Sequence, residues 1–361
     1  MSHYEQRLEQ DLNQIRKQVA EVADRVEIGL RDAMHALLSG NHKMAYATIL
    51  GDLPINRRVR QIDQLCHSFI ALHLPSAGHL RLISSIIRTN IELERIGDYA
   101  VTICRESVQM SQPPQGVLAD KLELISEESR HMLSLATTAF KDGNAEAAKA
   151  TKGMAAQINH AFSSTFSDLT SEESGFDLKD LMRLFNVFHR LERVAAQAKN
   201  ICEETIFAVT GETKTPKVYH ILFLDEGNNG LSQMAEAIAR RNFPNSGHYT
   251  SAGRYASTEL NPSIAEFMQA RGFEFNEIHP KQLDMTASEL SELHVIVSLQ
   301  GAVKNYIPEI PFHTVAMEWD VGTLPTGLTP EQTNQQQEAI YREIAVRAQD
   351  LMQTLRGTGA S

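Results

Sequence analysis

One short segment carries the residue types and spacing of an anion-binding loop. It follows an apolar run that ends at Leu224, and a helical pattern begins at its far end. At such a junction, backbone N–H groups and the positive end of the helix dipole point at one spot, which favours an anion. The two acidic side chains of the segment would repel one. The loop consists of Asp225, Glu226, Gly227, Asn228, Asn229, Gly230, Leu231 and Ser232.

A second group of candidate residues lies in the N-terminal part of the chain. Glu94 and Asp98 are four residues apart, so on a helix both carboxylates leave the same face and can share one hard cation. The alternative is a solvated acidic stripe whose charges are balanced by neighbouring arginines. The candidates for this pairing are Arg88, Arg95 or Arg105. The spacing leaves both interpretations open.

The periodicity after residue 217 predicts the elements that position the loop. Short apolar runs alternate with helical patterns, which is typical of a parallel sheet with helices on both faces. In such sheets ligands bind at the carboxyl ends of the strands, where this loop falls. A final helix from Glu331 to Leu355 would cover the sheet with Ile340, Ile344, Ala348, Leu351 and Leu355. The predicted strands are Val218 to Leu224, His248 to Ser251, His294 to Leu299 and His313 to Met317.

Apolar residues recur at helical spacing from Tyr4 to Val209, and this part of the chain repeats itself. Residues 39–56 align without a gap on residues 142–159, with seven of eighteen positions identical and a shared Gly-Asn turn. Residues 93–106 align in the same way on residues 191–204. We therefore predict a tandem duplication of a three-helix unit.

The C-terminal part, about residues 218–356, resembles the low-molecular-weight protein tyrosine phosphatase and arsenate reductase superfamily. The loop of that family reads Cys, five residues, Arg, Ser, and here Asp225 and Leu231 stand at the Cys and Arg positions. Trp319-Asp320 falls where the family has its general acid, with Val321 in place of a Pro. Three further segments match the family, namely Ser232-Gln233-Met234-Ala235-Glu236-Ala237, Ser251-Ala252-Gly253 and Leu260-Asn261-Pro262.

The resemblance implies a phosphatase-like fold that has lost its catalysis. A carboxylate replaces the thiolate nucleophile, and the guanidinium that grips a phosphoryl group is missing. The only cysteines are Cys66, Cys104 and Cys202, so no thiol follows residue 202. Asp320 is then interpreted as a turn residue that caps backbone N–H groups. The alternative is an enzyme in which Asp225 is a carboxylate nucleophile for phosphoryl transfer and Asp320 its acid or base.

About residues 4–210 resemble the PhoU family of phosphate-uptake regulators. The match rests on Leu-Glu-Arg-Ile-Gly-Asp from residue 93 and on Asp-x-x-Ile-Asn from residue 52. Each repeat of that family carries a Glu/Asp-x-x-x-Asp motif that can hold Mg, Mn or Fe. Here Glu94 and Asp98 complete the motif in the first repeat, whereas Glu192 in the second is followed by Ala196. The resemblance thus implies weak binding of a divalent metal.

The resemblance also implies the partners, which are the ATPase subunit of a phosphate transporter and a phosphate-sensing histidine kinase. We expect a homodimer. Residues 1–210 hold 23 Lys and Arg against 27 Asp and Glu, and residues 211–361 hold 11 against 18, so neither part has the basic field that nucleic acid requires. The N-terminus lacks a signal-peptide pattern and no apolar run reaches membrane-spanning length, so we expect a cytoplasmic protein without membrane insertion.

We therefore predict an all-α pair of PhoU-like three-helix repeats followed by an α/β parallel-sheet domain of the low-molecular-weight phosphatase type. The predicted bounds are 4–112 and 117–209 for the repeats, 210–217 for a linker, and 218–356 for the α/β domain. The predicted function is regulation of phosphate uptake and signalling through protein contacts, with the inactive phosphatase-like domain used for binding.

Overall fold

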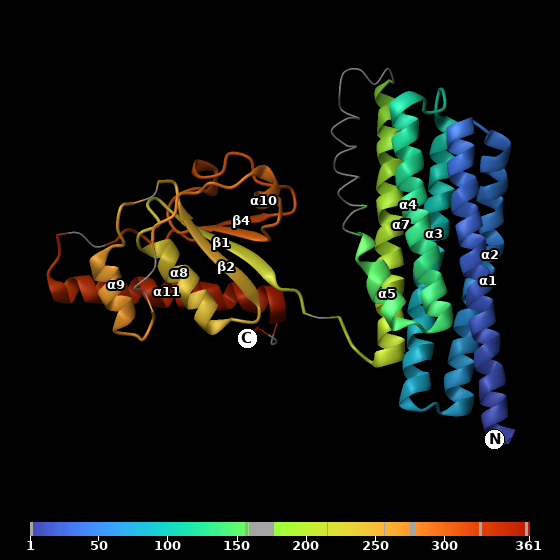
Figure 1. Cartoon of the computed structure of the whole chain (residues 1–361), viewed down its shortest axis with the longest axis horizontal. Coiled ribbons are helices and arrows are strands. Elements are labelled where there is room, and N and C mark those ends of the chain that lie inside the picture. Colours follow the sequence, from blue (N-terminus) through green and yellow to red (C-terminus); the bar gives the residue numbers. More distant parts are fainter. Residues whose placement is uncertain are drawn as a thin grey trace. The chain divides into compact units, whose positions relative to one another are not determined.

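The chain divides into two compact units, Met1–Lys214 and Thr215–Ser361 (Figure 1). The computed structural model describes residues 3–155, 158, 177–214, 216–255, 257–274, 279–324, 327–357, 360 and 361. The first unit is helical, and the second contains a parallel sheet with helices. This is the predicted fold class.

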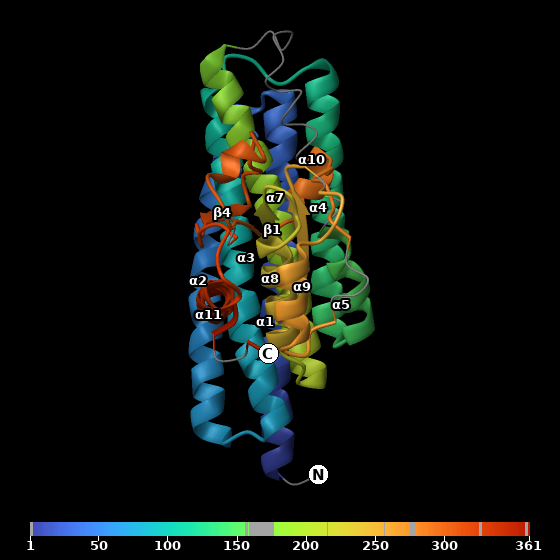
Figure 2. The same ribbon diagram turned by 90° about the vertical axis from the view of Figure 1, so that its left-hand side faces the viewer.

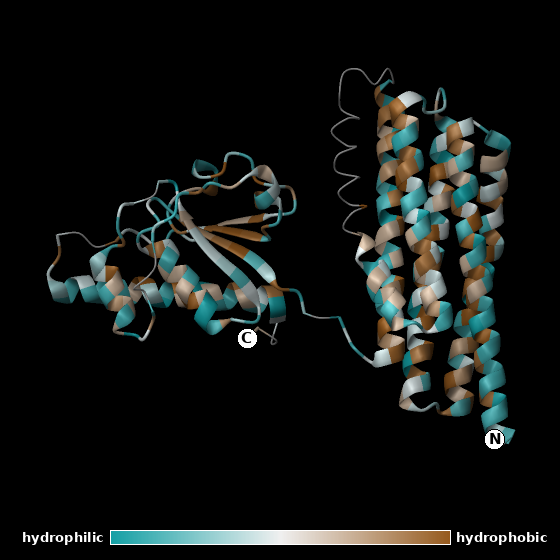
Figure 3. Cartoon of the chain, in the orientation of Figure 1, coloured by the Kyte–Doolittle hydropathy of each residue, from teal (hydrophilic) through white to brown (hydrophobic). Residues whose placement is uncertain are grey.

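The helical unit begins with three long helices, α1 (His3–Ser39), α2 (His42–His73) and α3 (Ala77–Gln109). They run side by side and contact one another along their lengths (Figure 1, Figure 2). The second repeat contributes α4 (Gly116–Asp142), α5 (Ala145–Lys152) and α7 (Leu178–Thr210). One apolar core joins both repeats, and Figure 3 shows brown and teal patches alternating along these helices.

The predicted Gly-Asn turn occurs in both repeats with the same local geometry. Gly40 and Gly143 have φ of 68° and 62°, in the left-handed region that glycine enters without steric cost. The next residue caps the following helix in each repeat. The Asn41 side chain accepts a hydrogen bond from the Met44 N–H at 3.1 Å, and the Asn144 side chain accepts one from the Ala147 N–H at 3.0 Å. The repeated sequence therefore specifies a repeated helix start.

The second unit is built on a four-stranded parallel sheet in the order β2-β1-β3-β4. The strands are β1 (Tyr219–Asp225), β2 (Gly247–Gly253), β3 (Val295–Ser298) and β4 (Val315–Glu318). Each observed strand overlaps its predicted run, with ends that differ by one or two residues. The other elements are α8 (Leu231–Asn242), α9 (Pro262–Gln269), α10 (Ala287–Ser291), a short 3-10 helix η1 (Val303–Asn305) and α11 (Pro330–Arg356).

Apolar side chains cover both faces of this sheet. Ile221 and Phe223 point to the face packed by α8, α9 and α11, whereas Leu222 and Leu224 point to the face packed by residues of α10 and η1. The alternation follows from the two-residue period of a strand. In α11 the residues predicted to face the sheet, Ile340, Ile344, Ala348 and Leu351, are buried, and Leu355 is partly buried against the same core. None of the described helices has the length and apolar character needed to cross a bilayer.

Candidate functional site

The predicted loop lies between the carboxyl end of β1 and the start of α8. Asp225 is the last residue of β1, and its side chain turns back into the loop with 2 % of the residue exposed. Its Oδ1 accepts a hydrogen bond from the Asn228 N–H at 2.5 Å, and its Oδ2 accepts one from the Ser232 N–H at 2.9 Å. The backbone donors that would hold an anion therefore hold the Asp225 carboxylate. We had expected this charge only to repel an anion, whereas in the structure it occupies the anion's place.

Asn228 fixes the shape of the loop. It is fully buried and has φ of 49°, a left-handed conformation that asparagine tolerates better than most residues. Its side chain donates to Ser232 Oγ at 2.9 Å and accepts from the Lys281 N–H at 2.8 Å. Gln233 Nε2 donates to the Asn228 backbone carbonyl at 2.6 Å. Polar groups of the loop itself, of Gln233 in α8 and of the Lys281 backbone thus hold the loop in this shape.

Neighbouring segments cover the loop closely. The Tyr255 N–H donates to the carbonyl of Glu226 at 3.0 Å, and the Ser257 N–H donates to that of Gly227 at 3.1 Å. A Cβ at Gly227 would lie 2.4 Å from Ser257 Oγ, and one at Gly230 would lie 2.6 Å from a methyl carbon of Leu324. A side chain at either glycine would therefore have to displace Ser257 or Leu324, which pack closely above the loop.

The electrostatics of Asp225 reflect two opposing effects. Burial raises the pKa of its carboxyl, and hydrogen bonds from Ser232, Asn228 and Gly227 oppose that rise. The effect of burial is the larger one, so the pKa of this carboxyl stays above its ordinary value. Because both of its oxygens are engaged and the residue is buried, the arrangement leaves it poorly placed to attack a substrate.

The other predicted loop residues do not join Asp225 in a catalytic arrangement. Leu231 is 1 % exposed and belongs to the apolar core, so this position offers packing and no charge. Glu226 is exposed. Asp320 is exposed too, follows β4 and has φ of 44°. Because β3 lies between β1 and β4, about 10 Å of sheet separates the ends that carry Asp225 and Asp320.

The predicted capping role of Asp320 is not seen among the described residues, where no hydrogen bond to its carboxylate is found. Its left-handed backbone instead marks the turn that returns the chain to the sheet. The Trp319 N–H donates to the Ser298 carbonyl at 2.8 Å, and the Val321 N–H donates to the Leu299 carbonyl at 3.1 Å. Both neighbours of Asp320 are thus tied to β3 or its continuation.

The acidic residues of the first repeat form a cluster between α2 and α3. Burial, and then the charges of Asp98 and Asp63, raise the pKa of Glu94. Burial and the charge of Asp98 raise the pKa of Asp52. Two residues of α2 therefore share the electrostatic environment of the predicted pair. The sequence contained a signal for one of them, because Asp52 and Asn56 repeat the four-residue spacing of Glu94 and Asp98.

Several buried oxygens in this cluster have no hydrogen-bond partner among the described residues. They are Asp52 Oδ1, Asn56 Oδ1 and Asn90 Oδ1. Unpaired buried acceptors are costly, and a cation or water can satisfy them. In the described part of the chain, however, no three His, Cys, Asp or Glu side chains converge closely enough to hold a metal ion. Carboxylate and amide oxygens are suitable ligands for a hard divalent cation, but the acidic side chains of the described residues do not lie close enough together to hold one.

The alternative of an acidic stripe balanced by Arg88, Arg95 and Arg105 needs correction. Arg88 pairs with Glu204 at 3.2 Å, and Arg95 pairs with Glu92 at 3.4 Å. Of these three, only Arg105 acts on the cluster, where it lowers the pKa of Asp52 against the larger effect of burial. Arg60, which was not predicted, lowers the pKa of Glu94 in the same way. The packing of α3 against α7 supplies the acidic partner of Arg88, which the sequence could not indicate.

The second repeat keeps Glu192, the counterpart of Glu94, but has lost the counterparts of Asp98 and Asp52. Glu192 contacts His189 at 3.0 Å between side chains and has no acidic neighbour four residues on. In the alignment of the repeats, Ala155 takes the place of Asp52 and Phe188 that of Asn90. Ala195 takes the place of Gly97 in the second repeat, where no carboxylate occupies the Asp52 position. In the first repeat a Cβ at Gly97 would lie 2.9 Å from Asp52 Oδ1. The space kept by glycine in the first repeat is needed for that carboxylate.

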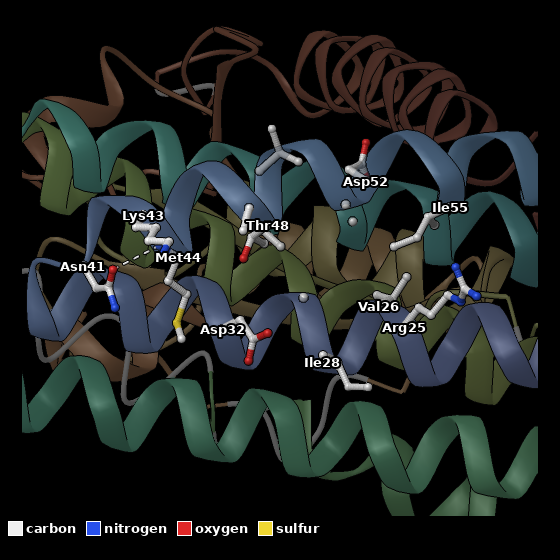
Figure 4. Close-up of a pocket in the computed structure, with 16 residues that line it drawn as sticks. Arg25, Val26, Ile28, Asp32, Asn41, Lys43, Met44, Thr48, Asp52 and Ile55 are labelled. Carbon is white, nitrogen blue, oxygen red and sulfur yellow. Dashed lines mark hydrogen bonds between the residues drawn. The ribbon is translucent and has the colours of Figure 1, made fainter.

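A cavity of about 520 Å³ adjoins this cluster between α1, α2 and α3 (Figure 4). One helical glycine from each helix lines it, namely Gly29, Gly51 and Gly97. Asp52 forms part of its wall, with the apolar side chains of Ile28, Met44 and Ile55 nearby. The cavity gives solvent a path toward the acidic cluster.

Comparisons with known proteins agree with this division. The PhoU domain matches residues 19–107 and 122–205, and the low molecular weight phosphotyrosine protein phosphatase family matches residues 220–358. The chain is 29 % identical over 215 residues to a phosphate-specific transport system accessory protein PhoU homolog of Pseudomonas putida, which covers 58 % of this chain and 83 % of the relative. The homolog of Pseudomonas aeruginosa is 28 % identical and covers 65 % and 94 %.

Solved structures show the same relation for the helical unit. The crystal structure of PhoU from Pseudomonas aeruginosa matches with a TM-score of 0.53 at 26 % identity, and covers 56 % of this chain and 99 % of that one. The regulatory protein PhoU from Streptococcus pneumoniae has the same fold, with a TM-score of 0.54 at 23 % identity and coverages of 58 % and 99 %. The chain thus matches the PhoU domain in its N-terminal part and the low molecular weight phosphotyrosine protein phosphatase family in its C-terminal part.

Proposed function

We propose that this protein is a non-enzymatic regulator of phosphate uptake and phosphate signalling. The PhoU domains and the phosphate-transport accessory relatives support the regulatory role. One observation supports the proposed loss of catalysis. The Asp225 carboxylate fills the loop at the place where a phosphoryl group would bind. In this proposal the phosphatase-like domain binds other molecules and performs no reaction.

The proposed partners are a phosphate transporter's ATPase subunit and a phosphate-sensing histidine kinase, and the proposed location is the cytoplasm. The experiment that tests the regulatory role measures phosphate uptake in cells that lack this chain, at low and high phosphate. We expect uptake to lose its dependence on phosphate supply, and we expect the full chain and an Asp225→Asn variant to restore it. Unchanged uptake in the deletion strain would contradict the proposal.

A second candidate function is phosphoryl transfer with Asp225 as nucleophile. The position of Arg254 favours this function. Its charge lowers the pKa of Tyr306, which the charges of Asp225 and Glu226 raise, so all three residues lie near Tyr306. The Arg254 guanidinium, however, lies over the Tyr255 ring at 5.6 Å from the centroid. Aspartyl-phosphate chemistry also needs a free carboxylate oxygen and usually Mg²⁺. The hydrogen bonds to both oxygens of Asp225 favour the non-enzymatic reading.

The first prediction is that the purified chain hydrolyses no aryl phosphate and reduces no arsenate in the presence of thiols. The physical reason is the lack of a thiol after residue 202 and of a guanidinium at Leu231. Steady-state assays measure both reactions, with an Asp225→Ala variant as the reference for background. Turnover in the wild type that vanishes in the variant would establish the enzyme instead.

The second prediction concerns the divalent metal that we propose at Glu94 and Asp98. Binding of Mg²⁺, Mn²⁺ or Fe²⁺ should be weak, because among the described residues no third acidic, His or Cys side chain converges on the pair, and the cation must displace a proton from Glu94, whose pKa is raised by burial. Calorimetric titration with Mn²⁺ measures the affinity, which should fall as the pH is lowered. Glu94→Gln/Asp98→Asn should abolish binding, whereas Glu192→Gln, the matched change in the second repeat, should not. Tight binding that survives the first variant would place the metal elsewhere.

A further inference from the structure

The strand β4 lies at the edge of the sheet and leaves apolar side chains in solvent. Among the described strands it pairs with β3 alone. Phe312 precedes β4 and is 95 % exposed, the highest value among the large hydrophobic residues described, and Val315 in the strand is 55 % exposed. A phenylalanine buries about 150–250 Å² when it packs, so one left fully in water marks a contact surface.

A hollow lies next to Phe312 on the same unit. It has a volume of about 530 Å³ and is formed between α10 and the segment that leads to β4. Pro311, the residue directly before Phe312, is part of its wall. Phe312 does not fill this hollow itself, because its own side chain is exposed. The lining residues are Ala287, Leu290, Ile307, Pro308, Glu309, Ile310 and Pro311, of which Glu309 alone is charged.

The polar groups beside the two features are complementary, because a histidine N–H can donate a hydrogen bond to a carboxylate. His313 follows Phe312, and the two rings touch edge to face with centroids 5.1 Å apart. His313 and Glu309 are both exposed, and neither has an ion pair among the described residues. If Phe312 of one copy enters the hollow of another, its neighbour His313 comes to the rim, where Glu309 supplies a carboxylate.

We propose that this surface is an isologous interface with a second copy of the chain, in which Phe312 of each copy fills the 287–311 hollow of the other and His313 meets Glu309. A two-fold interface requires that one patch hold both the projecting group and its receptor. Phe312 directly follows Pro311, which lines the hollow, so the projecting side chain and its receptor lie on one patch. Two copies can therefore satisfy each other and form a closed dimer. A receptor on a distant surface would have produced a ring or an open chain of copies instead of a two-fold dimer.

This inference deepens the proposed function, since it assigns a surface to the expected homodimer, but it does not depend on phosphate regulation. The two phenylalanines and their receptors form a small, mainly apolar contact, for which a weak and concentration-dependent dimer is expected. Aromatic side chains at the centre of such contacts commonly carry most of the affinity. Replacement of Phe312 should therefore weaken the dimer by about 30-fold or more.

The test uses the full chain and places a spin label at Val315→Cys, since the native Cys66, Cys104 and Cys202 are all buried. Pulsed electron paramagnetic resonance then measures the distance between labels on two copies. We expect a defined short distance that disappears in Phe312→Ser. Val346→Ser is the matched control, because Val346 is 56 % exposed on α11 and lies outside the proposed surface. A distance that arose from self-association through the helical unit would persist in Phe312→Ser.

A charge exchange makes the test specific for the proposed pairing. Glu309→Arg should weaken the signal because it sets a guanidinium against His313, and Glu309→Arg/His313→Glu should restore it. Sedimentation velocity on the same variants gives the change in dissociation constant. A label at Val315 that shows no second copy at any concentration would overturn the proposal. A signal unchanged by Phe312→Ser would overturn it equally.

Discussion

Asp225→Ala is expected to destabilise the C-terminal unit by about 3 kcal/mol and to turn the loop into a binding site for an added anion. In the wild type the Asn228 and Ser232 N–H groups both donate to this carboxylate. Removal of the side chain leaves two buried donors without a partner, and each such loss costs about 1–3 kcal/mol. Formate or sulfate that enters the vacated space should satisfy the same donors.

The single tryptophan of the chain provides the measurement. Trp319 is buried in the C-terminal unit, with its ring centroid 5.7 Å from that of Phe223. Its fluorescence therefore follows unfolding of the unit that contains the loop and not of the helical unit. Urea unfolding gives the free energy, and thermal unfolding with increasing formate or sulfate gives the rescue. Because sulfate stabilises folded proteins in general, the test is the difference between the two, and the midpoint should rise more steeply with anion in Asp225→Ala than in the wild type.

Glu226→Ala is the matched control for Asp225→Ala. It removes the same charge from the adjacent position, but Glu226 is exposed. Substitutions at such positions change stability by about 0.5 kcal/mol or less. If Asp225→Ala were as stable as this control and gained no response to anions, the carboxylate would not be the internal ligand of the loop.

The sequence predicted the scaffold of this site well because the scaffold depends on periodicity. Alternating apolar runs located all four strands, and the spacing of Ile340, Ile344 and Ala348 located the covering face of α11. The position of the loop followed from the strand before it and the helix after it. These signals are local, and each is repeated over several residues, so one exception does not erase them.

The state of the loop could not be predicted in the same way. The residue types showed that a thiol and a guanidinium are missing, but not that Asp225 folds inward and takes the donors for itself. That outcome depends on the left-handed backbone of Asn228 and on contacts from Lys281, which is more than fifty residues away. The pairing of Arg88 with Glu204 was missed for the same reason, since it joins α3 to α7. Side-chain partners across elements leave little trace in local spacing.

Asp225→Cys/Leu231→Arg is expected to gain phosphate binding without gaining phosphatase activity. The cysteine removes the internal carboxylate, which frees the loop donors, and the arginine adds a fork that can bind phosphate through two hydrogen bonds. Charge-assisted bonds contribute about 1.5–3 kcal/mol each, so the affinity should rise at least about tenfold over the wild type. Leu231 is 1 % exposed within the apolar core, so the variant should lose stability until phosphate binds.

Catalysis should remain absent in this variant because the acid is not in place. Asp320 is exposed on a left-handed turn beyond β4, and small misplacement of an acid is costly to a reaction. Calorimetric titration with phosphate measures binding, turnover of an aryl phosphate measures activity, and Asp225→Cys alone separates the freed donors from the added guanidinium. If the wild type bound phosphate as tightly as the double variant, the Asp225 carboxylate would have to leave the loop readily. The domain would then be a phosphate sensor in which Asp225 and phosphate compete for the same backbone donors.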